Sequence, residues 1–347
     1  MMVEAAQHRI GRLAIPFLLA GTAALFIVVQ GTTFLYLPPT PRDQERVQKV
    51  VEIPEGTTLR ETARRLFQDG LITSVEYFVA IGKLLGIERH IIPGEYALHT
   101  QMRPLEIFRL LKSGQVIQYE VTIPEGFALT QIARLVEEKQ LARAEDFIKR
   151  AADPEFIRSL GYDPPSLEGY LYPESYFFSK RTGVDGILHT LVKRFEAVYT
   201  QELAARAEAI GMTRQEIVTL ASIIEKETSD DAERPLVSAV FHNRMRKNIP
   251  LQSDPTVIYA IRKFNGNLTR RNLQIRSPYN TYRVKGLPPG PIANPGKASL
   301  LAALYPAQVD LLYFVSKNDG THYFSKTLIE HNRAVQKYQR RRSAKTS

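Results

Sequence analysis

The stretch between Arg12 and Arg42 contains no charged residue, and this feature constrains the fold more than any other. Its first part, 13–29, is almost entirely apolar, and the apolar character continues to Leu37. A helix needs about 20 mostly apolar residues to cross a bilayer. We therefore predict a transmembrane helix over 13–37, preceded by a short segment, 1–12.

The flanking residues predict how this helix is oriented. His8, Arg9 and Arg12 lie on its N-terminal side, so the positive-inside rule places that end in the cytoplasm. The apolar run is long for a signal peptide, and no small-x-small cleavage site follows it before Pro38. We therefore expect a single-pass protein of the cell inner (plasma) membrane with an extracytoplasmic body, and no nucleic acid as partner.

Composition excludes several kinds of site. The chain has no cysteine, which rules out disulfides and thiolate metal sites, and its seven histidines are scattered. We expect neither a metal nor a cofactor. The formal charge is +10, and six of these charges fall in 331–347, which has no acidic residue. Such a segment is typical of a solvated basic tail.

An internal repeat organises the region after the 38–48 linker. Val-Glu-Ile-Pro-Glu-Gly at 51–56 recurs as Val-Thr-Ile-Pro-Glu-Gly at 121–126. Each copy predicts a short strand, a turn and an amphipathic helix. We expect an α+β repeat region over 49–165 whose units share a small sheet. Further helical patterns cover 74–86, 104–113, 144–160 and 186–209.

The segment 166–178 combines five aromatic residues with two carboxylates. Sugar rings pack on aromatic faces while their hydroxyls bind carboxylates, so a glycan groove is one interpretation. A hydrophobic hinge between domains is the other. Because the chain lacks Trp, any stacking on sugars falls to Tyr and Phe, first of all those at 170–178 and 279–282.

A capping box formed by Thr213 and Glu216 predicts the start of a helix. At 100° per residue, Glu225 and Glu227 project about 200° apart, on opposite flanks of its apolar stripe. They cannot act as a pair on one bond, and the pattern alone does not choose between them. No metalloprotease, serine-hydrolase or phosphate-loop motif is present in the sequence.

Three motifs follow this helix: 251–259, which sets polar residues before a helix start, and the loops 277–282 and 286–296, which are rich in Pro, Gly, Asn and Tyr. In the first of them we expect Asp254 to cap a short helix and Pro255 to occupy its first turn. Rigid loops of this composition commonly carry binding groups.

The anchor, the Ile-Pro-Glu-Gly repeat, Ala-Ser-Ile-Ile-Glu-Lys-Glu-Thr (221–228) and the three loop motifs occur in the order typical of the YceG-like family, which the chain resembles. The resemblance implies a LysM-like region near the membrane and a mainly helical catalytic domain, 166–330. Members are lytic transglycosylases, carbon–oxygen lyases that cut peptidoglycan strands internally. Their catalytic glutamate matches Glu225.

On this resemblance, Glu225 would protonate the glycosidic oxygen and then accept the proton of the C6 hydroxyl, so a single carboxyl suffices. The expected partners are peptidoglycan strands, together with peptidoglycan synthases or division and elongation proteins. Residues expected to bind or position the substrate are Glu174, Gln252, Asp254, Thr256, Asn280, Tyr282 and Asn294.

Two other functions stay open from the sequence. The chain could be a non-catalytic scaffold that binds the cell wall through its repeats. It could also be a muramidase-type hydrolase that uses Glu174 or Asp254 as its second carboxylate.

Overall fold

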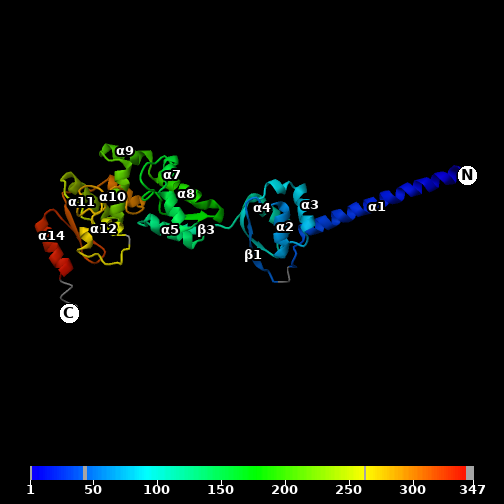
Figure 1. Cartoon of the computed structure of the whole chain (residues 1–347), viewed down its shortest axis with the longest axis horizontal. Helices are drawn as coiled ribbons and strands as arrows, with labels where there is room; N and C mark the ends of the chain where they lie inside the picture. The colour runs from blue at the N-terminus through cyan, green and yellow to red at the C-terminus, as the bar shows by residue number, and fades with distance from the viewer. Residues whose placement is uncertain (1, 42–44, 262, 341–347) are drawn as a thin grey trace. The chain divides into compact units, whose positions relative to one another are not determined.

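A computed structural model describes residues 2–41, 45–261 and 263–340 (Figure 1). Contacts divide the chain into two compact units, the first made of 1–119 with 179–181 and the second of 120–178 with 182–347. The boundary that we expected at 165 falls inside the second unit. The second copy of the repeat therefore belongs to the unit that carries the motifs after residue 213.

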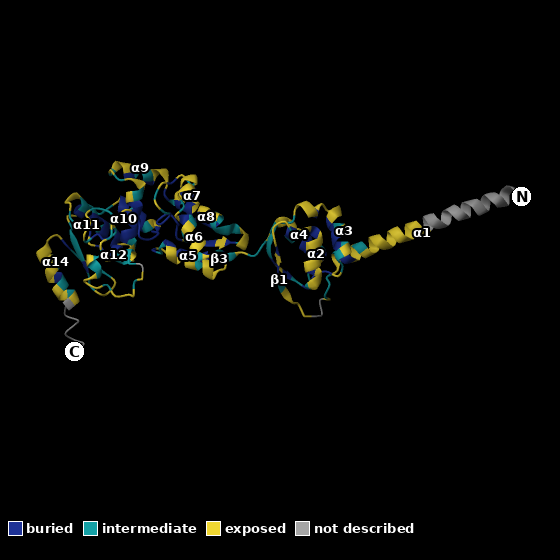
Figure 2. Cartoon of the chain, in the orientation of Figure 1, coloured by how far each residue is buried: buried dark blue, intermediate teal, exposed yellow. Residues whose placement is uncertain are grey.

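The N-terminal helix, α1, runs from Met2 to Tyr36. Its segment Leu19–Tyr36 is long and apolar enough to cross a membrane and is only 6% buried, as the exposed colouring in Figure 2 shows. The end of the helix is different. Phe34 is buried in the core of the first unit, where its ring stacks on that of Tyr77 at 5.9 Å. The helix is thus fixed to the first unit at its C-terminal end.

The rest of the first unit has the order strand, helix, helix, strand, helix. Its two strands pair antiparallel, from Gln48 opposite His99 to Ile53 opposite Gly94. The inward residues Val51 and Ile53 are buried, as strand alternation requires. The elements are β1 (Gln48–Ile53), α2 (Leu59–Gln68), α3 (Val75–Leu84), the 3₁₀ turn η1 (Ile87–Arg89), β2 (Gly94–His99) and α4 (Pro104–Ser113).

In the second unit, β3 (Tyr119–Thr122) pairs with β4 (Ser175–Phe178). The expectation of one sheet shared by the two repeat copies is therefore wrong, because each copy's strand pairs with a strand that follows it in the chain. The remaining elements are α5 (Leu129–Glu138), α6 (Ala144–Ala151), α7 (Pro154–Ser159), α8 (Gly183–Val198), α9 (Gln201–Ala209), α10 (Arg214–Glu227), α11 (Arg234–Arg246), α12 (Asp254–Ala260), η3 (Asn272–Gln274), α13 (Lys297–Leu304), β5 (Tyr313–Ser316), β6 (His322–Ser325), α14 (Leu328–Val335) and the π-helical turn η4 (Gln336–Arg340). The short turn η2 (Lys180–Thr182) lies where the chain passes between the two units.

Helix α10 is the centre of the second unit. The predicted capping box is confirmed: Thr213 Oγ1 accepts from Glu216 N, and Glu216 Oε2 accepts from Thr213 N at 2.8 Å. All residues from Ile217 to Ile224 are buried (Figure 2). Helices α9, α11, α12 and α13 pack against it. Its two ends reach the surface, and the C-terminal end carries the two glutamates.

The aromatic segment is core. Tyr170, Tyr172, Tyr176 and Phe178 are all buried, and only the ring of Phe177 is exposed. Neither the glycan groove nor the hinge interpretation fits this burial. Gly169 shows how tightly the segment packs, because a Cβ at its φ of +88° would lie 2.5 Å from Pro291 Cγ.

The C-terminal segment corrects another expectation. Residues 331–340 are helical, within α14 and η4, although we expected a solvated tail from 331. Ala334 is buried, and Asn318 Nδ2 donates to the Tyr338 carbonyl at 3.0 Å. Helix α14 packs against both strands of the β5–β6 hairpin. Residues 341–347 lie outside the described part of the chain.

Candidate active site

A pocket of about 350 Å³ lies on one flank of the C-terminal end of α10. It draws side chains from α10, α11, α12, the loops before α12 and after η3, the β5 strand and α14. The residues that line it are Glu227, Arg244, Leu251, Gln252, Asp254, Tyr282, Phe314 and His331.

Glu227 is half-buried in this pocket. Its Oε1 accepts a hydrogen bond of 2.5 Å from Ser253 Oγ. Burial raises the pKa of Glu227 to about 7, and the nearby charge of Asp254 adds to the rise, while the Ser253 hydrogen bond and Arg244 oppose it. A carboxyl with such a pKa holds a proton for a substantial part of the time near neutrality and can both donate and accept one.

Asp254 and Tyr282 also line the pocket. Tyr282 Oη donates to Asp254 Oδ1 at 2.6 Å, and burial together with this bond raises the pKa of Tyr282. Our expectation that Asp254 caps α12 is wrong. Ser253 is the N-cap residue and Asp254 the first helical residue. The Asp254 carboxylate is therefore directed to the pocket instead of to the helix backbone.

Arg244, which the sequence analysis missed, holds the pocket floor together. Its guanidinium donates to the carbonyl of Leu312 at 2.7 Å, to that of Leu251 at 2.8 Å and to Gln252 Oε1 at 3.2 Å. Gln252 has a left-handed φ of 54° and donates from its backbone N to the Thr281 carbonyl. A buried arginine in a helix gives no sequence signal, because its partners lie in other segments, the loop before α12 and the carbonyl of Leu312, 68 residues further along the chain.

Glu225 lies on the other flank of α10, as the helical periodicity predicted. Its Oε2 accepts from Gly296 N at 3.0 Å, and its Oε1 pairs with Arg234 Nη2 at 3.3 Å. Both side chains are only 6% exposed. Glu125, from the second repeat turn, is close by, and partial burial and the charge of Glu225 raise its pKa. Glu225 and Arg234 thus form a buried ion pair.

Four other residues expected to bind substrate hold structural partners outside the pocket. Glu174 forms a bidentate pair with Arg194. Thr256 is buried and shares a 2.8 Å hydrogen bond with the Thr281 hydroxyl. Of the expected binding residues, the pocket brings together Gln252, Asp254 and Tyr282.

The remaining two residues, Asn280 and Asn294, are fully buried. Asn280 Nδ2 donates to the carbonyls of Leu273 and Ile275. Asn294 Oδ1 accepts from Leu171 N, and its Nδ2 donates to Glu168 Oε1 at 3.1 Å. Both side chains therefore fix the loops that carry them.

Glu168 is a second carboxyl whose burial raises its pKa to about 7. It is enclosed by donors: Leu129 N at 2.9 Å, Asn294 Nδ2 and Tyr259 Oη at 3.3 Å. Because these groups surround it and it does not line the Glu227 pocket, we assign it a structural role at the start of α5.

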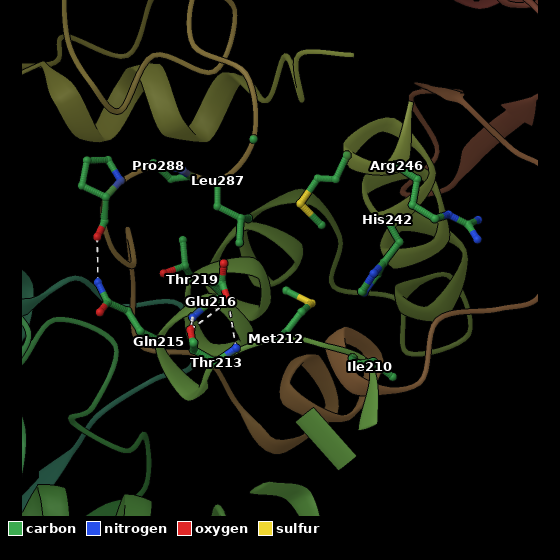
Figure 3. Close-up of a pocket in the computed structure, with 13 residues that line it drawn as sticks. Ile210, Met212, Thr213, Gln215, Glu216, Thr219, His242, Arg246, Leu287 and Pro288 are labelled. Atoms are coloured by element: carbon green, nitrogen blue, oxygen red, sulfur yellow. Dashed lines mark hydrogen bonds between the residues drawn. The ribbon is translucent and has the colours of Figure 1, made fainter. Parts of the chain in front are cut away.

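A larger pocket, about 600 Å³, lies at the opposite end of α10 (Figure 3). Its carboxyl side chain, Glu216, is engaged in the capping box, and Gln215 Nε2 donates to the Pro289 carbonyl at 2.8 Å. Among the described residues, no group of three or more His, Asp or Glu side chains could hold a metal ion. The Glu227 pocket is therefore the candidate active site.

Comparison with known proteins agrees with the order of the motifs. Residues 51–337 match the YceG-like family. The chain belongs to this family. It is 34% identical over 334 residues to an endolytic murein transglycosylase of Bacillus subtilis, covering 90% of this chain and 91% of that protein. An enzyme of the same name from Streptococcus pneumoniae R6 is 28% identical, with 82% of this chain and 57% of the relative covered.

A solved structure also resembles the chain. The crystal structure of a YceG-like protein from Listeria monocytogenes is 33% identical and superposes with a TM-score of 0.58, covering 82% of this chain and 98% of that one. The family assignment thus holds in both sequence and structure.

Proposed function

We propose that this chain is an endolytic lytic transglycosylase of peptidoglycan with Glu227 as its catalytic acid. The observation that carries the proposal is Glu227 itself, a half-buried carboxyl with a pKa of about 7 in a pocket that also holds Asp254. The names of the Bacillus and Streptococcus relatives support murein as the substrate.

Glu227 is a better candidate than Glu225, the residue that the family resemblance indicated. A catalytic acid needs a proton to give and access to the substrate. Glu227 lines a pocket and accepts a hydrogen bond from Ser253. Glu225 is instead engaged by Arg234 and Gly296 N, and its side chain is only 6% exposed.

The proposed reaction cleaves the β-1,4 bond between N-acetylmuramic acid and N-acetylglucosamine within a strand. Glu227 gives its proton to the bridging oxygen as the bond from C1 breaks. The C6 hydroxyl oxygen of the same muramoyl residue then bonds to C1, and Glu227 takes the hydroxyl proton. The product is a 1,6-anhydro ring, no water is consumed, and the carboxyl ends protonated as it began.

Asp254 suits the charge that develops in this reaction. The sugar ring becomes positive as the C1–O bond breaks, and a fixed carboxylate in the same pocket stabilises that charge. The tethered C6 hydroxyl removes the need for a second carboxyl to activate water. Tyr282 holds Asp254 in place through their 2.6 Å hydrogen bond.

The first unit, the helix α1 and the protein partners are also part of the proposal. The strand-helix-helix-strand order of the first unit is compatible with a LysM-like, glycan-binding fold. The exposed apolar helix α1 would anchor the protein in the cell inner membrane with its body outside, so that cutting acts on nascent strands. Peptidoglycan synthases or division and elongation proteins are the partners that such a location offers.

Product analysis tests the reaction class. Purified glycan strands incubated with the full-length protein should gain 1,6-anhydromuramoyl ends, which mass spectrometry detects. Reducing ends, one water heavier, would show instead a hydrolase, for which Asp254 is the available second carboxylate in the pocket. If the strands keep their length, the protein does not cut them, and the non-catalytic function as a cell-wall-binding scaffold would remain.

The pH profile should follow the Glu227 carboxyl. Because the acid must be protonated, the rate should fall about tenfold per pH unit above about 7. Asp254→Asn removes a charge that raises this pKa, so the falling limb should move to lower pH. Ser253→Ala removes a hydrogen bond that lowers the pKa of Glu227, so the falling limb of the pH profile should move to higher pH. Shifts of the same sign in both variants would contradict the assignment.

A further inference from the structure

His331 reaches the candidate active site from a segment that the sequence presented as a tail. It lies in the second turn of α14, about one hundred residues after Glu227, and lines the same pocket. Its ring stacks on that of Tyr313, with centroids 5.2 Å apart and an interplanar angle of 26°. The imidazole is thus part of one wall of the pocket.

The support of this wall is rigid. Helix α14 begins with a capping box between Thr327 and Glu330. Beyond it, Gln339 Nε2 donates to the Ser316 carbonyl at 3.1 Å, and Asn318 Nδ2 donates to the Tyr338 carbonyl. These bonds fix the C-terminal helix to the β5–β6 hairpin, so the position of His331 is determined before any substrate arrives.

The hydrogen bonding of His331 is unusual for a buried group. Its Nδ1 is buried and has no partner in the described part of the chain. The other half-buried histidines, His99, His242 and His322, all have partners for a ring nitrogen. Buried polar groups are normally paired, and an exception needs an explanation. Three other side-chain atoms share this state, on Tyr199, Ser238 and Ser325, but none of these residues lines the pocket.

The ring is neutral, and its tautomer follows from the contacts. Burial and the charge of Arg244 lower the pKa of His331. A proton on Nδ1 would be buried without an acceptor, so the neutral ring carries it on Nε2. An N–H donor at the edge of a sugar-sized pocket finds acceptors in hydroxyl, ring and acetamido oxygens.

We propose that His331 binds the glycan in the Glu227 pocket by donating a hydrogen bond from Nε2 to a saccharide oxygen. This inference rests on the proposed function and deepens it. It makes the C-terminal helix α14 part of the active site.

His331→Phe separates this role from a structural one. Phe keeps the stacking on Tyr313 and removes an unpaired buried nitrogen, which should leave the melting temperature unchanged or higher. Loss of one hydrogen bond to substrate should lower kcat/KM on purified glycan strands about tenfold. His331→Gln, whose amide nitrogen lies close to the position of Nε2, should recover part of that loss. His189→Phe, exposed on α8, is the control and should match the wild type.

Binding is measured in the Glu227→Gln background, so that strands are not cut. Adding His331→Phe should raise the dissociation constant for uncut strands several-fold. A His331→Phe protein that melts like the wild type and keeps its kcat/KM would overturn the inference and leave the proposed function standing. If the wild type itself produces no anhydro ends, the proposed function fails first. A melting temperature lowered by His331→Phe would show a structural role and equally reject the inference.

Discussion

Glu227→Gln should reduce the formation of 1,6-anhydromuramoyl ends by roughly 10²- to 10⁴-fold, the usual contribution of a general acid and base. The amide keeps the shape of the side chain and can still accept from Ser253, but it has no proton of suitable acidity to give. Initial rates on purified strands, with ends counted by mass spectrometry, measure the loss. A variant that cuts at the wild-type rate would exclude Glu227 as the acid.

The same substitution should not weaken the fold. The pKa of Glu227 is about 7 against an ordinary value of 4.5, so the folded state favours the protonated carboxyl. The stability gained from that proton is complete below pH 4.5 and is lost as the pH rises through 7. Gln carries no such charge. At pH 8 the variant should therefore have the same free energy of unfolding as the wild type or one that is higher by up to about 3 kcal/mol. Its melting temperature should be equal or higher accordingly.

Local sequence rules predicted the helix that carries the site. The Thr213–Glu216 capping box fixed its start, and the 100° periodicity placed Glu225 and Glu227 on opposite flanks, as their contacts show. Which flank is open could not be predicted, because it depends on loops 25 to 70 residues further along the chain. One loop closes over Glu225 through Gly296, and the other leaves Glu227 beside a pocket.

Long-range pairing explains the other differences. Each Ile-Pro-Glu-Gly copy formed the expected strand, turn and helix, but strand partners are chosen by tertiary packing, and the copies fell into different units. The sequence does contain a local signal for the C-terminal helix, the Thr-x-x-Glu pattern of Thr327 and Glu330. The prediction of a solvated tail rested instead on the basic composition of 331–347. No local sequence pattern indicated that His331 and Glu227 line the same pocket.

Glu225→Gln is the matched counterpart of Glu227→Gln, the same chemical change two residues away on one helix. It should destabilise the second unit by about 2–3 kcal/mol, because it removes the buried carboxylate partner of the Arg234 guanidinium and leaves it paired with Asp231, whose side chain is exposed. Thermal or urea unfolding of the full-length protein measures the loss. The rate of anhydro-end formation per folded molecule should stay close to that of the wild type.

The double variant Glu225→Gln with Arg234→Met separates the charge from the packing. Removing both partners of a buried ion pair is commonly less costly than removing one, so the double variant should be more stable than the sum of the single changes predicts. Arg234 also donates to Ser299 Oγ at 3.1 Å, and the cycle must therefore include Arg234→Met alone. If Glu225→Gln instead melted like the wild type and stopped the formation of anhydro ends, the acid would be Glu225. The pocket beside Glu227 would then have to bind substrate without performing the proton transfer.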